Sequence, residues 1–91
     1  MPIETGVISV DSEVKRIFDP SPSRRAFHIH NESGETVYLG GSNVTVADGF
    51  PLRGGGSFWL QQGHPTDATV RAAWYAVAEQ AASIRILEVE A

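Results

Sequence analysis

Two histidines, His28 and His30, are the side chains of this sequence best suited to bind a metal ion. Residues two apart on a β-strand lie on the same face, so both imidazoles would point the same way and could begin a zinc or copper site. Such a site needs a third protein ligand, and only His64 or a scattered carboxylate such as Glu32 could supply it. The pattern therefore favours a solvated or intersubunit polar face, and we expect no metal and no cofactor.

Other residues that could carry chemistry lack the spacing it requires. The glycine-rich run 53–57 has no Gly-Lys-Ser or Gly-Lys-Thr ending and precedes no expected helix, so it predicts a flexible connection and not a phosphate cradle. Asp48 with Glu79, or Glu88 with Glu90, could serve as acid and base in a glycosidase, but nothing in their spacing selects them. No serine lies in a Gly-x-Ser-x-Gly pattern. These observations predict that the chain has no catalytic residues and is not an enzyme.

The composition narrows the class of protein further. The chain has 91 residues, a net charge of −4 and only seven lysines and arginines, which argues against nucleic acid as a partner. It has no cysteine, and no apolar run approaches the roughly 18 residues of a membrane span. A chain of this size buries only about 60% of the surface it exposes when unfolded, so its own core is marginal. We expect one soluble domain that other proteins help to stabilise, with no membrane partner.

Alternating apolar and polar residues, broken by turn signals, predict that the chain is built from short strands. The strands are expected at 3–10, 13–18, 24–31, 36–40, 43–46, 57–62, 74–77 and 83–90. Asp48-Gly49 is a tight-turn signal, and Pro51 indicates that the next segment begins at a sheet edge. Pro20 and Pro22 predict an extended loop, so residues 1–22 form either an N-terminal arm or a strand pair.

Residues 66–83 are compatible with two structures. They are rich in alanine, begin with a possible cap at Thr66 or Asp67, and place apolar residues at helical spacing. The same stretch also contains a strand pattern at 74–77, which a turn at 78–82 could join to 83–90 as a hairpin. Because the rest of the chain indicates strands, a hairpin fits better than a lone helix.

Seven to eight short strands predict an all-β fold, a small antiparallel β-sandwich of jelly-roll-like or Ig-like type, over residues 1–91. The expected core comprises Phe27, Ile29, Val37, Leu39, Val44, Leu60, Val77, Ile86 and Leu87. Trp59 and Tyr38 alternate with core positions, so the second face carries aromatic rings, which indicates burial against another subunit or, alternatively, stacking on sugars. The candidate interface residues are Phe18, Arg24, Arg25, Tyr38, Trp59 and Trp74.

Residues 31–52 carry the pattern N-x-S-G-x-x-V-Y-L-G-G-x-x-V-T-V-x-x-G-F-P-L, followed by Gly56-Ser57. With this pattern, and with the runs 74–78 and 84–89 where the family has two final paired strands, the chain resembles small β-structured virion proteins of tailed bacteriophages. The similarity extends from about Arg24 onward. It implies a β-sandwich on the capsid exterior, a decoration or minor capsid protein that binds the major capsid protein and is often a homotrimer at local three-fold positions.

Two other functions fit the same residues. A carbohydrate-binding or fibre domain would use exposed aromatic rings to help a particle attach to its host. A connector or tail component would occur in few copies per particle, where a decoration protein occurs in hundreds.

Overall fold

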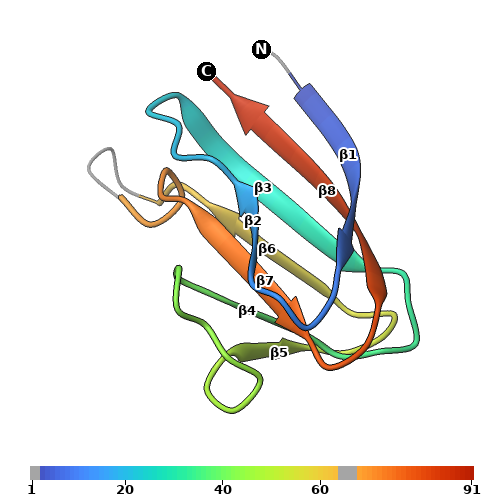
Figure 1. Ribbon diagram of the computed structural model, residues 1–91. Coiled ribbons are helices and arrows are strands. Elements are labelled where there is room, and N and C mark those ends of the chain that lie inside the picture. Colours follow the sequence, from blue (N-terminus) through green and yellow to red (C-terminus); the bar gives the residue numbers. More distant parts are fainter. Residues whose placement is uncertain (1–2, 64–67) are drawn as a thin grey trace.

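The computed structural model describes residues 3–63 and 68–91, which form eight strands and no helix (Figure 1). The part of the chain so described therefore contains no helix able to cross a membrane. The strands are β1 (Ile3–Val10), β2 (Lys15–Phe18), β3 (Arg24–Asn31), β4 (Val37–Gly40), β5 (Phe50–Leu52), β6 (Ser57–Gln61), β7 (Trp74–Ala78) and β8 (Ala82–Glu90).

The strands build two four-stranded sheets packed face to face. The first sheet has the order β1-β8-β3-β6 and the second has the order β2-β7-β4-β5, with every pair antiparallel. The chain changes sheet at every connection except the one from β4 to β5. This strand order is that of a jelly roll and not of the seven-stranded immunoglobulin sandwich. The predicted all-β sandwich is confirmed.

The expected strand at 43–46 is wrong, because this stretch belongs to the loop between β4 and β5. The Asp48 carboxylate accepts hydrogen bonds from the Thr45 backbone N–H at 2.9 Å and from its hydroxyl at 2.8 Å, and Gly49 N–H donates to Thr45 O at 2.8 Å. These local bonds compete with sheet pairing and close the loop. The second sheet instead gains the three-residue strand β5 directly after the expected turn.

The expected hairpin of the last two strands is also wrong, as is the alternative of a helix over the described part of 66–83. A strand does form at β7, but it pairs with β2 and β4, whereas β8 pairs with β1 and β3. The two strands contribute to the interior from opposite sheets, and a period of two does not show which strand is the hydrogen-bonding partner. The possible caps Thr66 and Asp67 lie outside the described residues.

The two N-terminal strands do not form a pair of their own. β1 pairs with β8 in the first sheet, and β2 pairs with β7 in the second sheet. Residues 3–18 therefore contribute one edge strand to each layer of the sandwich.

The interior is held together by a cluster of aromatic rings contributed by both sheets. The Phe27 ring lies 4.7 Å from that of Phe18 and 5.1 Å from that of Trp74, centroid to centroid, and Phe58 lies 5.7 Å from Trp74. Of the expected core, these residues are buried: Phe27, Ile29, Val37, Leu39, Val44 and Val77. Leu60 and Ile86 are half-buried against the core. Leu87 is wrongly assigned, because its register opposite His28 places it on the solvent side of the first sheet.

Asn31, the last residue of β3, organises two loops from a fully buried position. Its side-chain amide donates to Leu52 O at 2.9 Å and to Glu35 O at 2.6 Å, and its carbonyl oxygen accepts from the Ser33 N–H at 3.0 Å. Its backbone carbonyl accepts from Gly55 N–H at 2.8 Å. The glycine run is thus a hydrogen-bonded turn, in which Gly55 has a φ of 81° that favours glycine, and not the loose connection expected from composition.

Candidate functional site

The candidate site is the side of the first sheet that faces away from the core, which we call the outer face. Pairing across the four strands arranges its side chains in three rows, each of which runs from β1 through β8 and β3 to β6. The rows are Ile3-Val89-Ala26-Gln61, Thr5-Leu87-His28-Trp59 and Val7-Arg85-His30-Ser57. These residues lie together because side chains alternate between the two faces along each strand, so every second residue of a strand is on the same face.

Large apolar side chains are unusually exposed on the outer face. Ile3 is 65% exposed, Val7 56% and Trp59 61%. They are three of the six strongly exposed large hydrophobic residues in the described part of the chain. Leu87 and Val89, both half-buried, lie between them in the central strand β8. The outer face therefore presents apolar residues on β1 and β8 and a separate exposed indole on β6, with His28 between Leu87 and Trp59.

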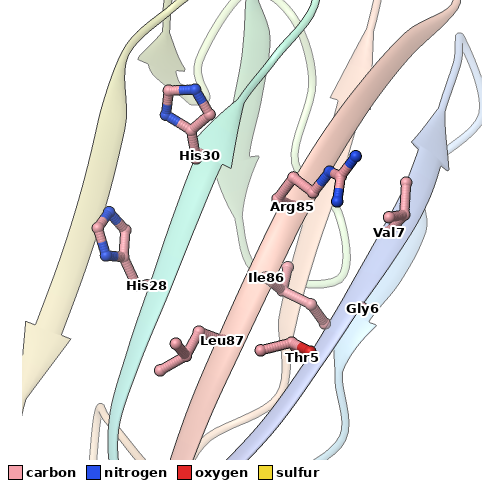
Figure 2. A pocket seen from close by; sticks show the side chains of 8 residues that line it. All are labelled: Thr5, Gly6, Val7, His28, His30, Arg85, Ile86 and Leu87. Carbon is pink, nitrogen blue, oxygen red and sulfur yellow. The ribbon is translucent and has the colours of Figure 1, made fainter.

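A shallow hollow of about 390 Å³ lies on this face, over β1, β8 and β3 (Figure 2). Its lining is Thr5, Gly6, Val7, His28, His30, Arg85, Ile86 and Leu87. Gly6 and Ile86 are paired in register and alternate with the outer-face residues, so they lie on the core side of the sheet beneath the hollow, and the Ile86 side chain points toward β1 in Figure 2. An open hollow with an apolar floor and a few polar groups suits a side chain of another molecule.

The two histidines share the outer face, as expected from their spacing. His30 Nδ1 lies 2.8 Å from Ser57 Oγ on the neighbouring strand, and both rings extend from β3 toward β6 in Figure 2. Within residues 3–63 and 68–91 no three potential ligands among His, Cys, Asp and Glu come together in a metal site. His64, the possible third ligand, lies outside the described residues. The geometry of the pair fits a polar contact and supplies no metal-binding set.

Glu32, the other possible ligand, is engaged at the end of this face. Its carboxylate accepts a hydrogen bond from Arg85 Nε at 2.6 Å and one from the Ser83 hydroxyl at 2.9 Å. The hydrogen bond from Arg85 and then that from Ser83 lower the pKa of Glu32 below its ordinary value. The carboxylate therefore stays ionised at neutral pH and offsets the charge of Arg85 beside the hollow.

The predicted interface residues lie in several different places, and only Trp59 is on the outer face. Tyr38 is half-buried on the solvent side of the second sheet, and Arg25 is exposed where β3 departs from regular register. Trp74 is half-buried in the aromatic cluster and donates from Nε1 to Thr69 O at 3.1 Å. Phe18 is buried in the same cluster, so it presents no surface to another protein.

Arg24 is also interior, at 1% exposure, although its charge suggested a surface contact. Its guanidinium donates to Glu88 Oε2 at 2.9 Å, to Ala72 O at 2.9 Å, to Val70 O at 3.2 Å and to the carbonyl of Asp19. The same group lies 4.9 Å from the centre of the Phe18 ring. Arg24 thus ties β3 and β8 to two loops, which is a structural role.

Ile3, Val7 and Leu87 belong to the outer face but were not predicted to do so. A usable signal exists in β1, where Ile3 and Val7 occupy one face while Ile8 and Val10 occupy the other. A strand that is apolar on both faces is typically covered on both sides. The apolar residues on both faces of β1 could therefore have predicted that the outer face is an interaction surface.

Comparison of the chain with protein-family models, with curated proteins and with solved structures finds no match.

Proposed function

We propose that this chain is a non-enzymatic structural protein whose outer face is covered by another protein. The partner is the major capsid protein of a tailed phage, and the chain acts on the exterior of the shell as a decoration or minor capsid protein. The capsid assignment is supported by the resemblance of residues 31–52 to virion proteins. The proposal that another protein covers the chain is supported by the exposed apolar residues of the outer face.

The observation that carries the proposal is the apolar character of the outer face. A sheet of a sandwich with one face on the core normally turns polar residues to water. On this sheet, Ile3, Val7 and Trp59 are each more than half exposed, with Ile3 and Val7 on the edge strand β1 beside β8 and Trp59 on the opposite edge strand β6. Contiguous exposed apolar surface marks interaction sites, and tryptophan is a frequent anchor in them.

Stabilisation of the shell then follows from mass action. A protein that binds the assembled lattice and not its separated subunits favours the lattice by about 2.7 kcal/mol per site when its free concentration is 100 times its Kd. Because the site repeats over the whole shell, the stabilisation of the shell is the sum of these small contributions from each site. The contacts of the outer face must be broken before the subunits beneath can separate.

Co-sedimentation with empty shells assembled from the major capsid protein of the phage that encodes this chain tests the proposal. We expect the purified chain to pellet with the shells and Trp59→Ala to lose at least tenfold in affinity, since the indole is an exposed anchor. Val46→Thr is the matched control, because Val46 is an exposed apolar residue of the β4–β5 loop, outside the outer face. Failure of the wild-type chain to pellet, or equal binding by Trp59→Ala, would refute the proposal.

Copy number separates decoration from a connector or tail role. Gel densitometry of purified particles is expected to give hundreds of copies per particle. A few copies per particle would favour the connector or tail assignment.

A carbohydrate-binding or fibre domain is the second candidate, favoured by the surroundings of one ring. Trp59 is exposed with His28 directly opposite on β3 and Gln61 two residues along its own strand, so an apolar platform has polar neighbours. Jelly rolls include lectin domains as well as capsid domains, so the fold is compatible with both candidates. Retardation of the wild-type chain, but not of Trp59→Ala, in gels containing host surface polysaccharide would favour this alternative.

A further inference from the structure

β1 is a long edge strand with little to prevent another strand from pairing with it. It lies at the end of the first sheet, and Figure 1 shows no strand on its far side. All eight of its residues pair with β8 without a register shift. Its only charged residue is Glu4, and it contains no lysine, arginine or proline. An edge of this kind presents unpaired backbone N–H and C=O groups to any strand that approaches.

Two of the other three edges of the sandwich, β2 and β5, are protected in ways that natural proteins use, and the third, β6, is shorter than β1. β2 has four residues, carries Lys15 and Arg16, and is irregular in register between Arg16 and Phe18. β5 has three residues with Pro51 at its centre, and β6 has five residues. Short length, positive charge, proline and a bulge each discourage pairing. β1 is therefore the longest edge strand of the sandwich and, unlike β2 and β5, has none of these protections.

We propose that β1 pairs antiparallel with β1 of a second copy of this chain, giving one continuous eight-stranded sheet across a two-fold axis. This inference does not rest on the proposed function. A second copy supplies a strand of the same length with the same alternation of faces, so the contact is self-complementary. With the axis at Gly6 or Val7, side chains of the outer face meet side chains of the outer face, and Ile3 and Val7 of both copies extend one apolar surface.

Glu4, the charged residue of β1, does not oppose this pairing. With the axis at Gly6, Glu4 lies opposite Ile8 of the second copy, and with the axis at Val7 it lies opposite Val10. The two Glu4 residues are then at least four residues apart along the sheet, or roughly 14 Å. That separation exceeds the Debye length of about 8 Å at physiological ionic strength, so their repulsion is largely screened.

The dimer would place two outer faces side by side in the same orientation. If each face binds a site on a repeating lattice, the second contact becomes intramolecular and the combined affinity rises. The pairing also predicts an even number of copies in the free protein, in contrast to the trimer implied by the resemblance.

Sedimentation equilibrium of the isolated chain and of two proline variants, Gly6→Pro and Val7→Pro, tests the pairing. Neighbouring amides in an antiparallel strand point to opposite edges, so only one of the two variants removes a donor used by β8. We expect the average molecular mass of the wild-type chain to rise from that of a monomer to that of a dimer as its concentration increases. The variant that keeps the wild-type melting temperature is expected to remain monomeric. A wild-type chain that is monomeric throughout or trimeric, or a proline variant with the wild-type melting temperature that still dimerises, would overturn the inference.

Hydrogen exchange decides the question if neither proline variant folds. In concentrated wild-type protein, alternate amides of β1 that do not bond to β8 should gain protection, and they should lose it on dilution. Equal exchange at both concentrations would overturn the pairing. Because these experiments use the chain without shells, a failure of the pairing leaves the capsid-binding test unaffected, and the reverse is also true.

Discussion

Replacement of Arg24 by methionine is expected to destabilise the fold more than any single change on the surface. The guanidinium is 1% exposed and donates to one carboxylate and three backbone carbonyls, those of Val70, Ala72 and Asp19. Methionine fills much of the same volume but donates no hydrogen bond. The carbonyls lose their charged donor inside the protein, where each unsatisfied group costs about 1–3 kcal/mol.

The size of the loss follows from burial of the ion pair. Removing one member of a buried pair costs about 3–5 kcal/mol. The lower end applies to this pair, because the Glu88 side chain keeps 18% exposure and can turn to water. A chain of 91 residues has a total stability of about 5–14 kcal/mol, so Arg24→Met removes a large share of it. At 4–8 °C per kcal/mol, we expect the melting temperature to fall by about 12 °C or more.

Urea denaturation followed by circular dichroism measures this loss. Arg85→Met is the matched control, because Arg85 also pairs with a glutamate, at 2.6 Å, but its side chain is 62% exposed. We expect the control to unfold near the wild-type midpoint, since exposed ion pairs contribute little. A loss below about 1 kcal/mol for Arg24→Met, or equal losses for the two variants, would refute the assignment of Arg24 as a structural residue.

Three further predictions concern the loops and the response to acid. Gly54→Ala should cost about 1–3 kcal/mol, because a Cβ there would lie 2.5 Å from the Ser33 carbonyl oxygen, whereas Gly34→Ala has open space and should be neutral; urea midpoints compare them. Asn31→Ala should cost roughly 3 kcal/mol in the same assay, since it removes the amide that bonds Leu52 O and Glu35 O, and a midpoint near that of wild type would contradict this role. The hydroxyls of Ser23 and then Ser21 lower the pKa of Glu90 below 4.5, so the unfolded chain takes up this proton at a higher pH than the folded chain. The stability contributed by the ionised Glu90 carboxylate is complete above pH 4.5 and is lost as the pH falls through the pKa of the folded state. Glu90→Gln should therefore flatten the decline of melting temperature in acid.

The sequence predicted the strands better than it predicted their partners. Alternation of Phe27 and Ile29 with His28 and His30 correctly separated a buried face from an exposed one. The same alternation could not show that β7 and β8 lie in different sheets, because strand pairing depends on contacts distant in sequence. At 43–46 the hydrogen bonds from Thr45 to Asp48 overcame an apolar pattern that otherwise indicates a strand.

Of the six candidate interface residues, only Trp59 lies on the outer face. Trp59 was recognised because its neighbours Phe58 and Leu60 are apolar and face the other way. Arg24 was misassigned, because a charged residue is rarely buried unless it is paired, and its partner Glu88 is 64 positions away. The aromatic residues Phe18 and Trp74 were placed at an interface for their size, but the interior required those rings.

The central position of β8 in the first sheet has a consequence for synthesis on the ribosome. β1 and β3 do not pair with each other, and their shared neighbour β8 is translated after all seven other strands. Until residues 82–90 emerge, β1 has no partner within the nascent chain, and closure of the sheet must wait for translation to reach them. Closure of this sheet is therefore late and depends on contacts between the first and last strands, so the unpaired β1 strand is exposed to aggregation until then.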